Sequence, residues 1–264
     1  MSRSAILNVM VQAALKAGRS LARDFGEVEN LQVSRKGPSD FVSAADIAAE
    51  KIVRTELQKA RPDYGFLMEE SGVIKGEDPQ HRWIVDPLDG TTNFLHGIPI
   101  FNVSIALERE GVIVAGVIYN PAMDELFTAE RGRGAFMNDR RLRVAARKSL
   151  PDCVIGTGIP FLGVGDHARS LKEIRHVMGE VAGLRRCGAA ALDLAWTAAG
   201  RYDGFWEHGL SPWDMAAGLL MVREAGGYVT DIDGGDQMFE TRSIVAGNEQ
   251  VQGQLRKLLV NARS

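Results

Sequence analysis

The stretch Arg82–Thr92 reads Arg-Trp-Ile-Val-Asp-Pro-Leu-Asp-Gly-Thr-Thr and joins a short apolar run to turn-forming and hydroxyl residues. Arg82–Val85 is typical of a buried strand, whereas Pro87 predicts a turn. Thr91 and Thr92 have side chains suited to the start of a helix. This order of strand, loop and helix start predicts one unit of a layered α/β fold.

Two helices and a strand are predicted before this stretch. Apolar residues recur at helical spacing between Ser4 and Arg23, which predicts a helix that docks on the core and not a signal or transit segment. A second helix is expected from about residue 43 to residue 60, because Pro62 cannot continue it. Tyr64–Glu69 is typical of a strand.

The pattern changes twice after the stretch. Between about residues 102 and 144, β-branched runs are separated by turn residues, which predicts an antiparallel meander. From about 154 to 261, short strands alternate with helices. The chain has no internal repeat or linker. We therefore expect residues 1–264 to form a single layered α/β domain, of the α+β type, with subdomains at about 1–150 and 151–264.

Composition excludes several classes of protein. The 264 residues carry 31 Lys and Arg against 34 Asp and Glu, so the net charge of −3 creates no overall field that would attract nucleic acid or anionic lipid. No apolar run approaches the roughly 20 residues that a membrane span needs. Cys153 and Cys187 lie far apart and form no metal or disulfide motif, which is typical of a cytoplasmic protein.

The densest chemical signal is the pair of carboxylates at Asp86 and Asp89. Three residues span at most about 10 Å, and the turn at Pro87 folds both carboxylates towards one point. Oxygen ligands of this kind suit Mg²⁺, with Asp86 bridging two ions and Asp89 contacting one. Gly90 lets the backbone approach a ligand, and the N–H groups of residues 90–92 suit a phosphate. The alternative is that Asp89 only caps the helix.

Two further acidic motifs are ambiguous when each is taken alone. Glu69 and Glu70 end a predicted strand and point to opposite faces, so only one of them can enter a site. Ser211 and Asp214 have the spacing of a helix capping box, with proline at the first helical position. Capping is the simpler interpretation of Asp214, although a helix start can also carry a functional carboxylate.

Together, these segments resemble the inositol monophosphatase family, a group of metal-dependent, lithium-sensitive phosphatases. The resemblance covers nearly the whole chain. It is carried, in chain order, by Lys36–Asp46, Glu69–Ser71, Trp83–Phe94, Gly188–Ala190 and Trp213–Gly218. It implies an α-β-α-β-α sandwich of the inositol monophosphatase and fructose-1,6-bisphosphatase type, and a homodimer.

The resemblance also implies a role for individual residues. The implied ligands of two or three Mg²⁺ ions are Glu69, Asp86, the Leu88 carbonyl, Asp89 and Asp214. The implied substrate contacts are Leu88, Asp89, Gly90 and Thr91 near the phosphate, Gly188, Ala189, Ala190 and Glu207 on the alcohol side, and Asp214. In catalysis, Thr91 oriented by Asp46 and Glu69 would position and deprotonate a water. Asp214 would hold a second water that protonates the leaving alcohol.

The implied activity is Mg²⁺-dependent hydrolysis of a small phosphorylated polyol, with myo-inositol 1-phosphate as the first choice. Histidinol phosphate and fructose 1,6-bisphosphate remain alternative substrates. Position 189 is alanine where several relatives have serine or threonine, and position 43 is serine where threonine is usual. The reaction class is therefore better defined by the resemblance than the substrate.

A binding function is the alternative from another class. The basic run Arg140-Arg141-Leu-Arg143, followed by Arg147 and Lys148, would suit contact with an RNA or transcription complex. A solvated strand edge is the preferred interpretation of this run. Gly156 and Gly158 are interpreted as a structural turn, because Phe161 occupies the third glycine position of a dinucleotide-binding motif.

Overall fold

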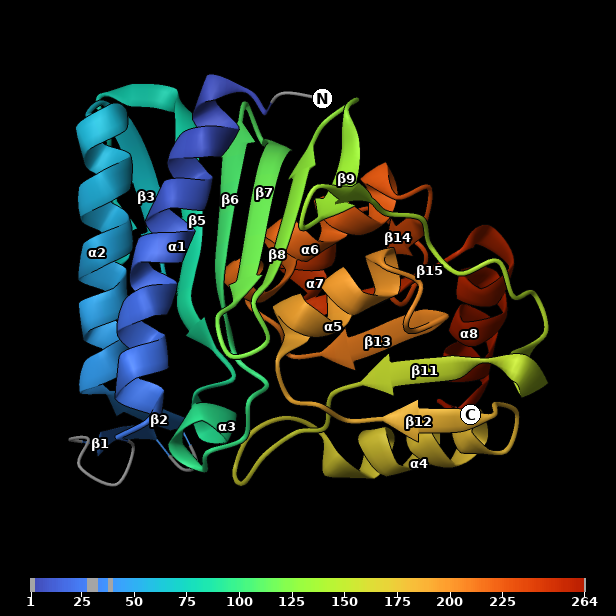
Figure 1. Cartoon of the computed structure of the whole chain (residues 1–264). Coiled ribbons are helices and arrows are strands. Elements are labelled where there is room, and N and C mark those ends of the chain that lie inside the picture. Colours follow the sequence, from blue (N-terminus) through green and yellow to red (C-terminus); the bar gives the residue numbers. More distant parts are fainter. Residues whose placement is uncertain (1–2, 28–32, 38–39, 264) are drawn as a thin grey trace.

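A computed structural model describes residues 3–27, 33–37 and 40–263 of the chain. Its elements stack in five layers: a helix pair, an eight-stranded sheet, a second helix pair, a five-stranded sheet and a third helix pair (Figure 1). This is the α-β-α-β-α sandwich that the resemblance implies. Within the described residues, no helix is both long enough and apolar enough to cross a membrane.

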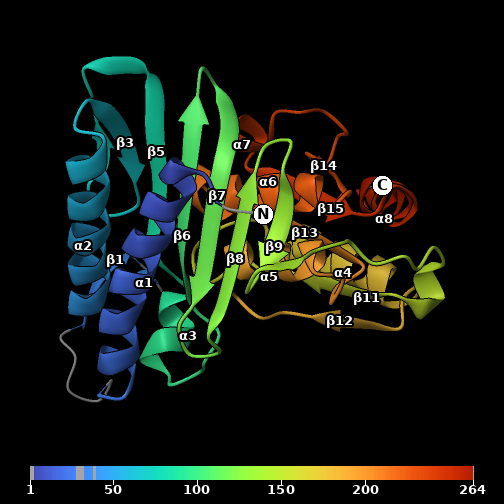
Figure 2. The ribbon, with the colours of Figure 1, turned by 45° about the horizontal axis from the view of Figure 1, so that its top comes forward.

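The first layer consists of helices α1, Ala5–Phe25, and α2, Ala44–Ala60. The Ser4 side chain caps α1 by accepting a hydrogen bond from the Leu7 N–H at 3.2 Å. The bounds of α1 and α2 confirm both expected helices. Both helices lie on the same face of the large sheet in two views (Figure 1, Figure 2). The first family motif, Lys36–Asp46, begins in β1, Val33–Gly37, and continues in β2, Asp40–Ser43. The part of the motif between these two strands lies outside the described residues.

The large sheet has the strand order β10-β9-β8-β7-β6-β5-β3-β4. Its strands are β3 (Tyr64–Met68), β4 (Gly72–Ile74), β5 (Asp78–Asp89), β6 (Asn102–Arg109), β7 (Val112–Asn120), β8 (Glu125–Glu130), β9 (Gly134–Met137) and β10 (Arg140–Arg141). Strands β6 to β10 form the expected antiparallel meander. Strand β5 joins the meander to β3, because it pairs antiparallel with β6 and parallel with β3.

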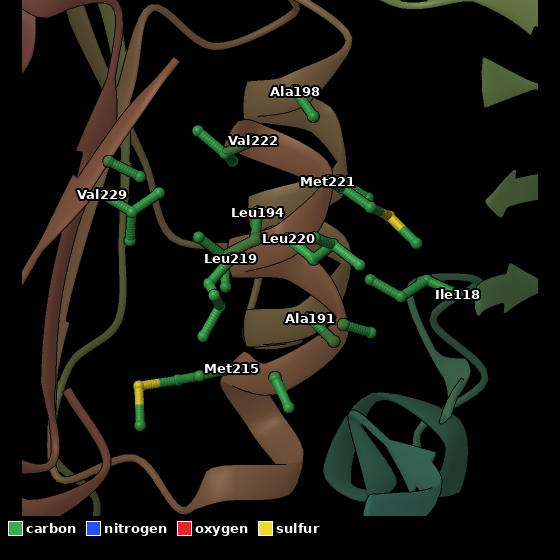
Figure 3. Close-up of a cluster of buried hydrophobic side chains, with 14 of the residues drawn as sticks. Ile118, Ala191, Leu194, Ala198, Met215, Leu219, Leu220, Met221, Val222 and Val229 are labelled. Carbon is green, nitrogen blue, oxygen red and sulfur yellow. The ribbon is translucent and has the colours of Figure 1, made fainter. Parts of the chain in front are cut away.

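Helices α5, Ala190–Ala198, and α6, Pro212–Glu224, form the middle layer. Their side chains fill a buried cluster that extends from Ile118 of the large sheet to Val229 of the small one (Figure 3). The two helices approach closely, since a Cβ on Gly218 of α6 would lie 2.5 Å from the Cβ of Leu194. The central cluster therefore joins both halves of the chain.

The small sheet has the order β12-β11-β13-β15-β14 and mixes parallel with antiparallel pairs. Its strands are β11 (Val154–Thr157), β12 (Gly183–Arg185), β13 (Gly204–His208), β14 (Tyr228–Thr230) and β15 (Ser243–Gly247). The outer layer consists of α4, His167–Met178, and α8, Glu249–Asn261, while α3, Thr91–Leu95, and α7, Met238–Thr241, are short connecting helices. A separate buried cluster packs α4 and α8 on this sheet.

Candidate active site

The stretch Arg82–Thr92 does not form the expected turn at Pro87. Strand β5 continues through Pro87 to Asp89, and the register with β6 shifts between Asp86, opposite Ser104, and Asp89, opposite Asn102. Three steps along β5 therefore match two steps along β6, which is a bulge. The two carboxylates converge through this bulge at the end of a strand, and the predicted turn is wrong.

Asp89 is held by donors from both halves of the chain. Its Oδ2 accepts a hydrogen bond from Asn102 Nδ2 at 2.8 Å and another from the Ala191 N–H at 2.9 Å. Asn102 begins β6, and Ala191 lies in the first turn of α5. The alternative of Asp89 as a helix cap is not what the structure shows, because Gly90 occupies the N-cap position of α3.

Glu69 and Asp214 reach the same place from two other elements. Strand β3 ends at Met68, and the Glu69 N–H donates to the Val85 carbonyl at 3.2 Å, which sets Glu69 beside the end of β5. Asp214 lies in the first turn of α6, where its Oδ2 accepts a hydrogen bond from the Ser211 N–H at 2.7 Å. The expected capping contact of Asp214 is therefore present, and the residue also lies at the acidic cluster.

Burial and neighbouring negative charge both act on the carboxylates of this cluster. Burial raises the pKa of Asp86 well above its ordinary value, and the charges of Glu69, Asp89 and Asp214 raise it further. Burial and then the charge of Asp89 raise the pKa of Asp214 to about 7. Burial raises the pKa of Asp89 as well, although its hydrogen bond from Asn102 opposes the shift. A divalent cation would relieve this repulsion.

The donor set fits Mg²⁺ in its chemistry. Four carboxylates and the nearby Leu88 carbonyl offer hard oxygen ligands only. Among the residues that the structure describes, no three His, Cys, Asp or Glu side chains already surround one point as the ligands of an ion do. Backbone donors hold one oxygen of Asp86, through the Leu88 N–H at 2.9 Å, and one oxygen of Asp214. Side-chain movements would be needed for these carboxylates to close around an ion.

Thr91 lies at the start of α3, beside Gly90. Its Oγ1 lies 3.1 Å from Asp46 Oδ1 and 2.9 Å from the Leu88 carbonyl, so the single hydroxyl proton can be given to either acceptor. Asp46 is buried in the first turn of α2. Gly90 has a φ of 88°, and a Cβ there would lie 2.7 Å from the Ile100 carbonyl oxygen. Only glycine fits this position.

The predicted alcohol side lies next to this turn. A Cβ on Gly90 would lie 3.3 Å from the Cβ of Ala189, directly before α5. Asn93 Nδ2 connects the two segments by donating to the Ile100 and Cys187 carbonyls, each at 2.8 Å. The Arg186 guanidinium lies over Gly188, where a Cβ would meet its Nη1 at 2.9 Å.

Two more acidic residues occur on this side. Burial raises the pKa of Glu207 well above its ordinary value, and the charges of Asp193, Asp214 and Asp89 raise it further. The carboxyl group of Glu207, at the end of β13, fills space left by Gly158, whose Cβ would lie 1.8 Å from Glu207 Oε1. Burial also raises the pKa of Asp193 on α5. Gly158 is thus a packing glycine next to the site.

The structure brings the predicted residues together from segments far apart in the chain. Sequence reasoning missed three carboxylate or amide groups around them: Asn102, Glu50 and Asp193. Glu50 lies four residues after Asp46, on the same helix face, and Asp193 interrupts the apolar helix Ala190–Ala198; both patterns were visible signals. Asn102 gave no signal, because its register with β5 depends on the bulge.

The basic run lies away from these residues. Arg140 and Arg141 form β10, the exposed edge strand of the large sheet, which agrees with the preferred interpretation of a solvated edge. Arg147 is paired with buried Asp203 at 2.9 Å and so has a structural partner.

Comparison with known proteins gives concordant matches over nearly the whole chain. A family model described as the inositol monophosphatase family matches residues 2–264. A Mesorhizobium japonicum protein named inositol-1-monophosphatase is 72% identical over 257 residues, which are 97% of each chain. A Pseudomonas aeruginosa protein named Nus factor SuhB is 47% identical, over 92% of this chain and 91% of its own. The crystal structure of extragenic suppressor protein suhB from Bartonella henselae, 68% identical, has a TM-score of 0.95 and covers 97% of this chain and 98% of that one.

Proposed function

The chain belongs to the inositol monophosphatase family of phosphoric monoester hydrolases, and we propose that it hydrolyses myo-inositol 1-phosphate to inositol and phosphate with Mg²⁺. One observation carries the proposal. Carboxylates from β5, from the end of β3 and from the first turn of α6 lie close enough for neighbouring charge, added to burial, to raise the pKa values of Asp86 and Asp214. Such a cluster is typical of a divalent-ion site.

We propose that the ions, two or three in number, are held by Glu69, Asp86, the Leu88 carbonyl, Asp89 and Asp214. Bound Mg²⁺ supplies a Lewis acid that acidifies water and neutralises charge on the phosphoryl oxygens and the departing alkoxide. Gly90 and Thr91 would contact the phosphate, next to Leu88, Asp89 and Asp214.

The protein's own groups would then carry the proton transfers. Thr91 Oγ1, held by Asp46, would position the attacking water, and Glu69 would accept its proton. Asp214 would hold a second water that gives a proton to the leaving alkoxide. The water attacks phosphorus in line with the leaving oxygen, so no covalent phosphoenzyme forms.

The alcohol would be held by Gly188, Ala189, Ala190 and Glu207. The half-buried Glu207 carboxyl can accept hydrogen bonds from polyol hydroxyls. Ala189 supplies no hydroxyl of its own, so histidinol phosphate and fructose 1,6-bisphosphate remain the alternative substrates that a test must include.

The test is phosphate release from a panel of inositol, sugar and histidinol phosphates, with Mg²⁺ and with added Li⁺. We expect the fastest release from inositol 1-phosphate and inhibition by Li⁺. Release from none of these esters would contradict the proposal. Faster release from histidinol phosphate or the bisphosphate would keep the reaction and replace the substrate.

A second candidate, a binding module for an RNA or transcription complex, is favoured by the relative named Nus factor SuhB. The exposed edge strand at Arg140 and Arg141 is the surface to test. If the protein acts by binding, its effect in the cell should be lost in the double variant Arg140→Glu, Arg141→Glu and kept in Asp89→Asn. The opposite result would assign the physiological role to hydrolysis.

A homodimer is proposed on an exposed apolar segment. Ile159, Phe161, Leu162 and Val164 between β11 and α4 are all exposed, and Leu162 is 71% exposed. Apolar side chains gathered in this way are typical of a surface covered by a partner. Leu162→Glu should shift the protein towards a monomer in light scattering with size-exclusion chromatography, whereas an unchanged mass would place the interface elsewhere.

We also propose one domain and a cytoplasmic location. The central cluster contains Ile84 and Ile118 from the first half and Leu194 and Met221 from the second, which supports residues 1–264 acting as one unit with two subdomains. Cys153 and Cys187 are both free thiols, which suits a reducing compartment.

A further inference from the structure

We propose that Glu50 of α2 is a positioning residue that fixes the turn carrying Glu69. Together with Asp46 one helical turn earlier, it would make α2 the common frame for both groups that act on the attacking water. This inference rests on the roles proposed above for Glu69 and Thr91, and it adds a residue to which none of those roles is assigned.

The Glu50 carboxylate accepts three hydrogen bonds from Glu70 and Ser71, in the turn that follows Glu69. Its Oε2 accepts from the Glu70 N–H at 2.9 Å and from the Ser71 N–H at 3.3 Å. Its Oε1 accepts a short hydrogen bond from Ser71 Oγ. Only 4% of Glu50 is exposed, so water competes little for these donors. A buried carboxylate with three protein donors holds its surroundings in one geometry.

These contacts restrain Glu69 from one side, and β5 restrains it from the other. Residues 69–71 connect β3 to β4, with Met68 paired to Gly72. The Glu69 N–H donates to the Val85 carbonyl at 3.2 Å. With the next two N–H groups bound to Glu50, the backbone on both sides of the Glu69 Cα is fixed. Loss of the two Glu50 contacts would therefore release the backbone on one side of Glu69.

Helix α2 connects this turn to Thr91. Asp46 and Glu50 are spaced i and i+4, so they lie on the same helix face, and both are buried. Asp46 Oδ1 lies 3.1 Å from Thr91 Oγ1. Ala49, Val53 and Leu57 on the same helix are fully buried, which anchors α2 in the core. One rigid element therefore sets the separation between the Glu69 turn and the Thr91 hydroxyl.

A purely structural role is the competing explanation, because Glu50 also satisfies two backbone donors. The two roles differ in what they change. Lost stability lowers the amount of folded enzyme, whereas a displaced Glu69 lowers kcat and weakens Mg²⁺ binding in enzyme that is fully folded. Glu69 is assigned no substrate contact, so KM should stay unchanged when Mg²⁺ is saturating.

The test compares Glu50→Gln with the matched control Glu56→Gln on the same helix. Gln keeps the shape of Glu50, but its NH₂ group cannot accept the hydrogen bonds that Glu70 and Ser71 donate. We expect kcat to fall about 10- to 100-fold, with KM within about twofold at saturating Mg²⁺, and Mg²⁺ affinity measured by titration calorimetry to fall about 10-fold. Glu56 makes an exposed pair with Lys16, so its variant should match the parent.

A double-variant cycle with Glu69→Gln then separates the explanations. If Glu50 acts through Glu69, Glu50→Gln should reduce the residual rate of Glu69→Gln by less than twofold. A full additional 10- to 100-fold loss, or unchanged kcat and Mg²⁺ affinity in folded Glu50→Gln, would overturn the inference. An active Glu69→Gln enzyme would instead refute the proposed role of Glu69.

Ser71→Ala covers the case in which Glu50→Gln does not fold. It removes one of the three hydrogen bonds and leaves the carboxylate in place. We expect kcat to fall about three- to tenfold with unchanged KM, because the turn is loosened and not released. Wild-type kcat and wild-type Mg²⁺ affinity in this variant would contradict the positioning role.

Discussion

The two sides of the site hold their carboxylates in different ways. On the α2 side, Asp46 and Glu50 are matched by donors from Thr91, Glu70 and Ser71. On the α5 side, the buried Asp193 carboxyl has no well-formed hydrogen bond among the described residues, although burial raises its pKa while the nearby Tyr202 hydroxyl lowers it. Burial also raises the pKa of Glu207 on that side. Protein donors therefore hold the carboxylates on the α2 side, whereas the carboxyl groups on the α5 side are held less firmly.

This difference assigns different tasks to the two sides. Carboxylates with protein donors are fixed before any ligand binds, which suits the orientation of a reacting water. The half-buried Glu207 carboxyl can accept a hydrogen bond from a polyol O–H, whereas the Asp193 carboxyl, 1% exposed, is out of reach of the ligand. The α2 side should therefore control kcat, and the α5 side should control KM and substrate choice.

Asp89 lies between the two sides, and its replacement should have the largest effect. Asp89→Asn should lower phosphate release by about 10³-fold, because it removes a charge from the proposed ion site while Asn102 and Ala191 still hold the side chain. Circular dichroism should show an unchanged fold. Asp139→Asn at the surface is the control, and equal activities of the two variants would refute the metal assignment.

Thr91→Val tests whether the α2 side acts on kcat. The loss of the hydroxyl that contacts Asp46 should lower kcat by about 10²-fold and leave KM within a few fold. Thr91→Ser keeps the hydroxyl and should retain most of the activity. A rise in KM with normal kcat would show that Thr91 serves binding and would remove the contrast between the two sides.

Metal removal should reveal the repulsion among the carboxylates. Asp86, Asp89 and Asp214 have raised folded-state pKa values, so the unfolded chain releases these protons first as pH rises from about 4. Stability is therefore lost as pH increases, up to about 7 for Asp214. With EDTA, Tm should be roughly 5 °C lower at pH 8 than at pH 5.5, and Mg²⁺ should restore it. A metal-free Tm that rises over this range would contradict the cluster.

Gly158→Ala should have the smallest effect and should fall on the α5 side alone. The new methyl group would occupy the space of the Glu207 carboxyl, which must move. We expect KM for inositol 1-phosphate to rise about three- to tenfold with kcat nearly unchanged. Initial rates over a range of substrate concentrations measure this, and a loss in kcat alone would place Glu207 in the reaction step.

The layers could be predicted from the sequence because local patterns decide them. The apolar spacing of α1, the stop at Pro62 and the turn residues between β6 and β10 all agree with the structure. The prediction was wrong at Pro87, where pairing with β6 overrides the local preference for a turn and produces a bulge. The pairs β1–β2 and β3–β4 were not predicted, because strands this short carry little periodicity.

The site could be predicted only in part. The paired carboxylates identified Asp86 and Asp89, and the resemblance added Asp214, for which the local pattern alone favoured a helix cap; the structure brings these residues together. Their supporting partners depend on contacts between distant segments. Ala191 and Asn102 meet at Asp89 only after both sheets have packed on the middle helices. No local pattern encodes such a contact.

The close approach of Gly218 to Leu194 has an evolutionary consequence. The first turn of α6 carries Asp214, and the first turn of α5 follows Gly188 and Ala189. A larger residue at Gly218 would collide with Leu194, and relief of that collision would push the helices apart and widen the space between the proposed ion ligands and the proposed alcohol side. Selection for bulkier esters can thus operate through a hidden position that never touches the ester.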